Sequence, residues 1–78
     1  MEFLPNETYC CYGRVDTKNS SDGISNYLVT LADDSQINLK VTNGNELVLG
    51  NVYSFTFECR FNGTRNSYIL IKEKDIFE

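Results

Sequence analysis

Histidine and tryptophan are absent from this 78-residue chain, and proline occurs once. Histidine is the commonest general base in enzymes, so its absence removes the usual proton acceptor of a catalytic site. The glycines form no phosphate-binding loop ahead of a helix. The cysteines, Cys10, Cys11 and Cys59, lack the spacing of a zinc site. We therefore expect a binding protein and not an enzyme, with no catalytic residues, no metal and no cofactor.

Long apolar runs are missing as well. No stretch approaches the roughly 18 apolar residues that a membrane span needs. Residues Met1–Glu7 show neither the basic segment nor the apolar run of a secretion signal. An odd number of cysteines also fits a secreted disulfide framework poorly. We expect an intracellular protein, cytoplasmic or nuclear, that does not contact a membrane.

Positive charge is scarce, because the chain has 7 Lys and Arg residues and 11 Asp and Glu residues, which gives a net charge of -4. This balance argues against a protein that coats nucleic acid by bulk electrostatics alone. A chain of 78 residues supplies one hydrophobic core, so we expect residues 1–78 to form a single domain.

Alternation of apolar and polar residues, interrupted by turn residues, recurs along the chain and predicts strands. Gly13 inside the first run predicts a bulge or a sharp bend. Lys18–Gly23 has the composition of a flexible loop, and Asn62-Gly63 that of a tight turn. The expected strands cover Thr8–Thr17, Ser25–Ala32, Ile37–Val41, Tyr53–Phe61 and Ser67–Lys72.

The predicted inward faces supply one core. The fourth run alternates without a break, so all its odd-numbered residues through Phe61 are expected inside. Glu46–Gly50 is too short for more than a helical turn and is expected to plug one end of a barrel. The predicted elements follow in the order strand, loop, hairpin, short crossover and hairpin. This is the order of a five-stranded OB-type (oligonucleotide/oligosaccharide-binding) Greek-key barrel, so the expected fold class is all-β. The other expected inward residues are Tyr9, Cys11, Val15, Tyr27, Val29, Leu31, Ile37, Leu39 and Val41.

Basic residues flank two of the predicted loops. Arg14 and Lys18 flank the loop after the first strand, and Arg60 and Arg65 flank the loop between the fourth and fifth strands. In OB barrels, oligonucleotides lie on these loops and on the face of strands two and three between them. Tyr12 shares a strand face with Arg14 and is a candidate to stack on an unpaired base. The sequence thus predicts a nucleic-acid-binding site at Arg14, Lys18, Arg60, Arg65 and Tyr12.

Two further features have competing interpretations. Tyr27 and Tyr68 are also stacking candidates, but the inward alternation favours packing in or beside the core. The acidic pair Asp33-Asp34 is a candidate for a hard cation, but the surrounding residues favour a hairpin turn.

Three segments, Tyr12–Val15, Tyr27–Asp33 and Gln36–Leu39, resemble the opening of small OB-fold subunits. They share a Gly-Arg-aliphatic step, then an aliphatic strand that ends in Asp before an alternating strand. The pattern is similar to the smallest subunit of replication protein A, the eukaryotic single-stranded DNA-binding heterotrimer, and to its telomere-capping counterpart. The resemblance implies an acidic assembly partner in DNA replication or related single-strand metabolism.

Asp75–Glu78 resembles the acidic, Phe-bearing tails through which bacterial and phage single-stranded DNA-binding proteins recruit partners, which implies a phage or mobile-element origin as an alternative. Two functional hypotheses stay open. The first is an OB-fold protein that binds single-stranded nucleic acid weakly or serves as an accessory subunit. The second is an acidic protein-binding barrel, such as a viral or mobile-element inhibitor of a host nucleic-acid-binding protein. Oligomeric state and the choice between DNA and RNA are open at this point.

Overall fold

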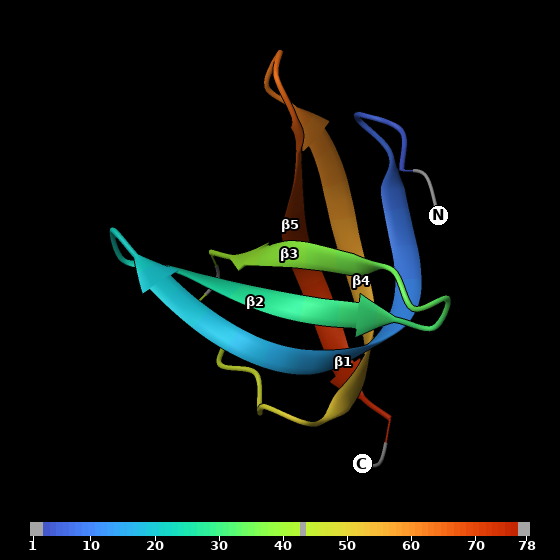
Figure 1. The fold of residues 1–78 in the computed structure, drawn as a ribbon, viewed down its shortest axis with the longest axis vertical. Coiled ribbons are helices and arrows are strands. Elements are labelled where there is room, and N and C mark those ends of the chain that lie inside the picture. Colours follow the sequence, from blue (N-terminus) through green and yellow to red (C-terminus); the bar gives the residue numbers. More distant parts are fainter. Residues whose placement is uncertain (1–2, 43, 77–78) are drawn as a thin grey trace.

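A computed structural model describes residues 3–42 and 44–76, and this part of the chain forms five strands and no helix (Figure 1). The strands close into a barrel in the order β1-β2-β3-β5-β4. All neighbouring pairs are antiparallel except β3 and β5, which are parallel. The predicted all-β, five-stranded OB-type barrel is confirmed. Its strands are β1 (Thr8–Ser21), β2 (Ile24–Leu31), β3 (Gln36–Val41), β4 (Val52–Phe61) and β5 (Asn66–Asp75).

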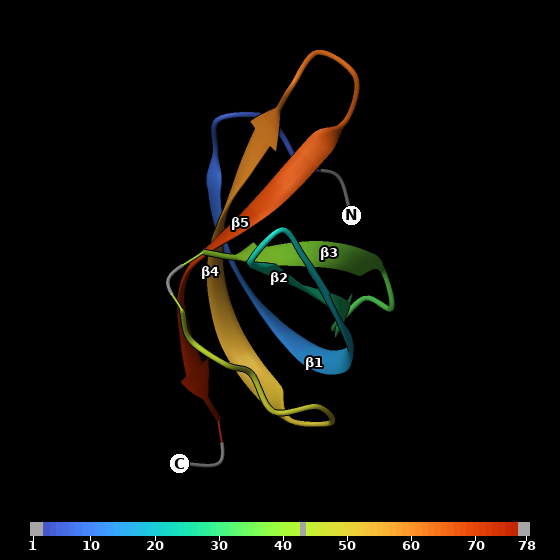
Figure 2. The same ribbon diagram turned by 90° about the vertical axis from the view of Figure 1, so that its left-hand side faces the viewer.

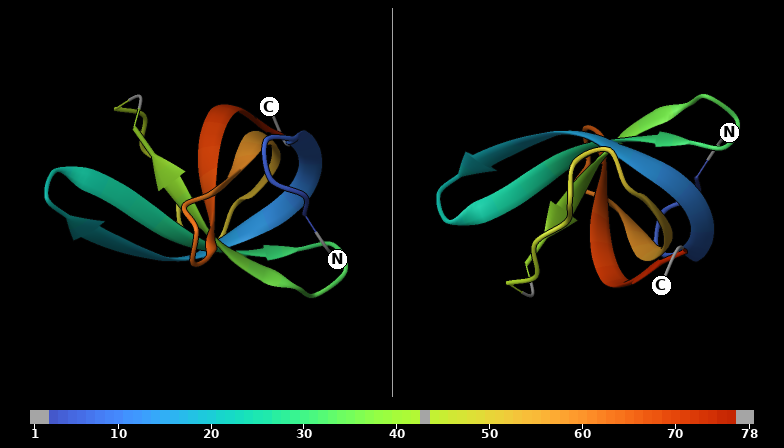
Figure 3. Two further views of the ribbon diagram at one scale, coloured as in Figure 1. Left: turned by 90° about the horizontal axis from the view of Figure 1, so that it is seen from above. Right: turned by 90° about the horizontal axis from the view of Figure 1, so that it is seen from below.

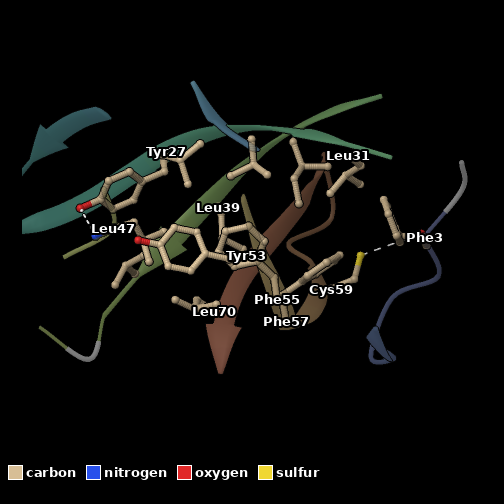
Figure 4. Packing of buried hydrophobic residues seen from close by; sticks show 14 residues of the cluster. Phe3, Tyr27, Leu31, Leu39, Leu47, Tyr53, Phe55, Phe57, Cys59 and Leu70 are labelled. Carbon is tan, nitrogen blue, oxygen red and sulfur yellow. Dashed lines mark hydrogen bonds between the residues drawn. The ribbon is translucent and has the colours of Figure 1, made fainter. Parts of the chain in front are cut away.

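Alternate side chains of the strands fill the barrel (Figure 4). Tyr27, Phe55 and Phe57 are fully buried, as the alternation predicted. The exception is Phe61, which is 54% exposed although the sequence predicted it inside. β4 runs on past the core at this point, and Phe61 pairs only with Asn66 at the end of the β4–β5 hairpin.

Two side chains from outside the strands cover opposite sides of the core (Figure 4). Leu47, in the loop between β3 and β4, is buried, and its backbone N–H donates to the Tyr27 hydroxyl at 3.2 Å. It is the plugging residue of Glu46–Gly50. Phe3 covers the other side and was not predicted, because it lies before the alternating runs. Its ring packs edge-on against Tyr9, Phe57 and Tyr68, at centroid distances of 4.8, 5.3 and 5.5 Å.

The bend predicted at Gly13 lets β1 serve two parts of the barrel. Gly13 pairs with both Tyr53 of β4 and Leu31 of β2. A Cβ atom at this position would lie 2.5 Å from Cγ1 of Val29, so a larger residue here would force the Val29 side chain or the strand to shift. The bulge itself lies further along, at Asp16, where the register with β2 shifts.

The flexible loop predicted over Lys18–Gly23 is wrong, because β1 continues to Ser21 and pairs with β2 throughout. The turn consists of Asp22 and Gly23 alone, at φ 52° and 77°, the conformation of the tightest hairpin turns. This hairpin arm projects away from the barrel (Figure 3). Its polar residues resemble a loop in the sequence because the arm extends beyond the core.

The β4–β5 hairpin also differs from its prediction. β5 extends to Asp75 instead of Lys72, and the hairpin rises beyond β3 (Figure 2). Its turn contains four residues, 62–65, and not the two of Asn62-Gly63. Oδ1 of Asn62 accepts hydrogen bonds from the backbone N–H groups of Thr64 and Arg65, both at 3.0 Å. The Asn62 side chain thereby fixes the position at which Arg65 leaves the turn.

Candidate nucleic-acid interface

A groove of about 540 Å³ lies between the β2–β3 pair and the start of β5. β3 and β5 cross steeply and pair only through Leu39–Tyr68 and Lys40–Ile69 (Figure 1). Residues before these pairs on both strands line the groove. The groove therefore lies where the barrel opens between β3 and β5, just before the short stretch over which these two strands pair.

Carboxamide side chains dominate the groove lining. β2 and β3 direct their odd-numbered side chains into the core, so their even-numbered residues face outward. Asn19 reaches the groove because β1 extends into the hairpin arm, where it pairs with Asn26. The five carboxamides come from four strands: Asn19, Asn26, Gln36, Asn38 and Asn66.

In the part of the chain that the structure describes, no carboxylate lines the groove, although the chain carries 11 acidic residues. Its two cations are Lys40 and Arg65, and neither has an ion-pair partner among residues 3–42 and 44–76. The groove is therefore a positively charged region on an acidic protein. Three cations elsewhere are neutralised locally, in the pairs Arg14–Asp16, Lys18–Glu46 and Arg60–Glu58.

The structure distributes the five predicted binding residues over several places. Arg65 lines the groove. Tyr12, which is 60% exposed, and Arg14 line a separate depression of about 270 Å³. Lys18 lies on the hairpin arm, and Arg60 lies on β4. A role for these last four residues in binding nucleic acid stays a prediction.

The structure distinguishes between the competing interpretations of Tyr27 and Tyr68. Tyr27 is fully buried, and its hydroxyl accepts the hydrogen bond from Leu47, so it is a core residue. Tyr68 is half-buried, packs against Phe57 at a centroid distance of 5.9 Å and also lines the groove. It is the aromatic side chain among the described residues that line the groove.

Lys40 and the carboxamides were not identified from the sequence. The signal was present, since Gln36, Asn38 and Lys40 alternate with the apolar residues predicted to face inward from the third strand. Outward polar residues are normal on any half-buried strand, so the alternation alone does not mark them as a site.

A chain of hydrogen bonds runs across β1, β2 and β3 beside the groove. Arg14 Nε donates to Oδ1 of Asp16 at 2.8 Å, and the Thr30 hydroxyl donates to Oδ2 of the same carboxylate. Gln36 Nε2 in turn donates to Oγ1 of Thr30 at 3.3 Å. The hydrogen bond from Thr30, and then that from Arg14, hold the pKa of Asp16 below its ordinary value. Asp16 is therefore ionised at neutral pH.

The acidic pair after β2 forms a turn, as predicted. Asp34 has a φ of 69°, and Oδ1 of Asp33 accepts a hydrogen bond from the backbone N–H of Ser35 at 3.1 Å. The Ser35 hydroxyl and then its N–H lower the pKa of Asp33 to about 2. The Asp33 carboxylate thus stabilises the β2–β3 connection over the whole neutral range.

The thiols are arranged as the alternation predicted. Cys59 is buried and Cys11 half-buried, and burial raises the pKa of both thiols. Cys10 is exposed, and hydrogen bonds with the hydroxyls of Ser54 and Thr56 lower its pKa. Among the described residues, no group of three or more metal-ligating side chains comes together.

Comparisons with protein-family models, with curated proteins and with solved structures found no match. No helix of the described residues is long and apolar enough to span a membrane. Phe77 and Glu78, which carry the likeness to acidic recruitment tails, lie outside the described residues. A functional assignment therefore depends on the groove and its chemistry.

Proposed function

We propose that this protein binds a short segment of single-stranded nucleic acid in the groove between the β2–β3 pair and β5. The observation that carries the proposal is the groove's charge. Among the residues that the structure describes, the groove lining has no carboxylate, and Lys40 and Arg65 have no ion-pair partners, on a chain of net charge -4. The position also supports it, since OB barrels bind oligonucleotides on the face of strands two and three.

The side chains divide the expected contacts among them. Arg65 and Lys40 bind phosphates, and Tyr68 stacks on one base. Two phosphate contacts on a single strand give a slope of log K against log salt of only about -1.4. We therefore expect weak binding with a shallow salt dependence, on a site of roughly 4–16 nucleotides.

A pair of charge-reversed variants tests the proposal. Lys40→Glu with Arg65→Glu reverses the groove, whereas Lys72→Glu with Lys74→Glu reverses two exposed cations of β5 that do not line it. Both double variants change the net charge equally. In fluorescence anisotropy at low salt, with a labelled single strand of about 12 nucleotides, we expect the groove variant to lose affinity more than about tenfold and the control less than about threefold.

Thermal melts of both variants verify that the barrel remains folded. Equal losses in the two variants would show that bulk charge, and not the groove, governs binding. If the wild-type protein binds no single strand at low salt, the proposal is wrong and the hypothesis of an acidic protein-binding barrel takes its place.

A further inference from the structure

We propose that Phe3 is a positioning residue of the groove and holds the Tyr68 ring in the orientation that stacks on a base. Phe3 is not among the described residues that line the groove, so it acts through Tyr68 and does not touch the ligand. The segment 3–7, which precedes β1, thereby supports the β5 wall of the groove where β3 does not. The inference rests on the proposed function and adds a residue to the same site.

The β5 wall lacks support from β3 where the groove opens. In the described part of the chain, β5 pairs with β3 only at Tyr68 and Ile69. Asn66 and Ser67 come before these pairs; they are paired with β4 along one edge and line the groove. A strand end that is paired along one edge alone opens readily, so other contacts are needed to fix it.

Phe3 supplies such contacts. Its ring packs edge-on against the Tyr68 ring, at a centroid distance of 5.5 Å and an interplanar angle of 73°. Phe57 of β4 approaches the same ring at 5.9 Å and 84°. The Phe3 carbonyl also accepts a hydrogen bond from Nδ2 of Asn66 at 3.4 Å. One ring from the barrel and one ring from the segment before it therefore fix the half-buried Tyr68 side chain.

The segment 3–7 is itself anchored to β4. Asn6 lies in a turn, at a φ of 65°, that separates Phe3 from β1. Its backbone N–H donates to the Cys59 carbonyl at 2.7 Å, and the Cys59 N–H donates to the Glu7 carbonyl at 2.9 Å. The Cys59 thiol donates to the Phe3 carbonyl at 3.9 Å (Figure 4). These bonds hold the buried Phe3 ring in one place.

The orientation of Tyr68 matters because stacking depends on the overlap of two flat faces. A ring that is already held in place loses less conformational entropy when the strand binds, which strengthens binding. Leucine in place of Phe3 keeps an apolar side chain over the core but removes the flat ring beside Tyr68. The Tyr68 ring can then turn away from the orientation that stacks.

A double-mutant cycle measures this coupling, by fluorescence anisotropy at low salt with a labelled deoxycytidine strand of about 12 nucleotides. We expect Phe3→Leu to weaken binding roughly 3- to 10-fold, and Tyr68→Leu, which removes the stacking ring, about 5-fold or more. In the Tyr68→Leu background, Phe3→Leu should weaken binding less than about 1.5-fold, because no ring remains to be positioned. In Phe3→Leu alone, the slope of log K against log salt should stay at about -1.4, since Lys40 and Arg65 still contact phosphates.

Leu47→Val is the control for a general loss of stability. Leu47 is 6% exposed and covers the opposite side of the core from Phe3, which is 7% exposed. Both variants should lower the melting temperature, but Leu47→Val should change the affinity less than about 1.5-fold. If Phe3→Leu melts below the assay temperature, Phe3→Met replaces it, because the flexible thioether fills the space without a flat ring.

The outcomes separate this inference from the proposed function. If Phe3→Leu binds as tightly as the wild type, or if Tyr68→Leu does, the positioning role is wrong while the proposed function stands. The same holds if Phe3→Leu costs an equal factor with and without the Tyr68 ring, if Leu47→Val weakens binding as much, or if the salt slope falls with the affinity. If the wild-type protein binds no single strand, the proposed function fails and this inference fails with it.

Discussion

At the scale of single residues, Gly13 is the position where the barrel depends most directly on the absence of a side chain. In Gly13→Ala the added methyl would lie 2.5 Å from Val29 Cγ1 and 3.2 Å from Leu31 Cδ2. We expect this overpacking to lower the free energy of unfolding by about 1–3 kcal/mol. Urea denaturation measures the change.

Cys10→Ala is the matched control, because Cys10 is exposed on the same strand, and it should change stability by less than about 0.5 kcal/mol. If Gly13→Ala is as stable as the wild type, β1 does not approach β2 at the bend as closely as the structure shows.

The sequence predicts inward residues such as Tyr27 and Phe55 correctly because alternation depends only on neighbours along the chain. Partners across the sheet depend on strand register, which the sequence does not reveal. This explains why Lys40 was overlooked, because its place in the groove depends on which strands adjoin. The ion pair of Arg60 with Glu58 is different, since both residues lie on the same face of β4, two positions apart, where the alternation alone brings them together.

At the scale of elements, the loop between β3 and β4 offers a test of its role as a plug. Leu47 is 6% exposed, and Leu49, two residues further along, is 54% exposed. We expect Leu47→Ala to lower the free energy of unfolding by about 2–3 kcal/mol and Leu49→Ala by less than about 0.5 kcal/mol. Equal effects in chemical denaturation would mean that the loop does not close the barrel.

The hairpin arm shows why the length of β1 escaped prediction. Residues 18–21 of β1 extend beyond the core, so no apolar residue marks their inward face. Backbone pairing with β2, begun by the turn at Asp22 and Gly23, holds them in the strand. Asn19 reaches the groove only because of this extension.

At the scale of the whole molecule, the net charge of the chain and the charge of the groove have opposite signs. The chain carries -4, yet the groove lining, as far as the structure describes it, has two cations without ion-pair partners and no carboxylate. The acidic surroundings repel a polyanion at long range, so the groove must act through close contacts. The proposed function therefore predicts weak binding of a strand whose bases enter the groove.

The most direct test of the groove as the binding site is an NMR titration of ¹⁵N-labelled protein with a deoxycytidine strand of about 12 nucleotides. We predict that the backbone signals of Lys40 and Arg65 and the side-chain NH₂ signals of Asn38 and Asn66 shift progressively. Signals of Ser54, on the outer face of β4, should stay in place. Shifts confined to the depression at Tyr12 and Arg14, or no shifts at all, would contradict the assignment of the groove.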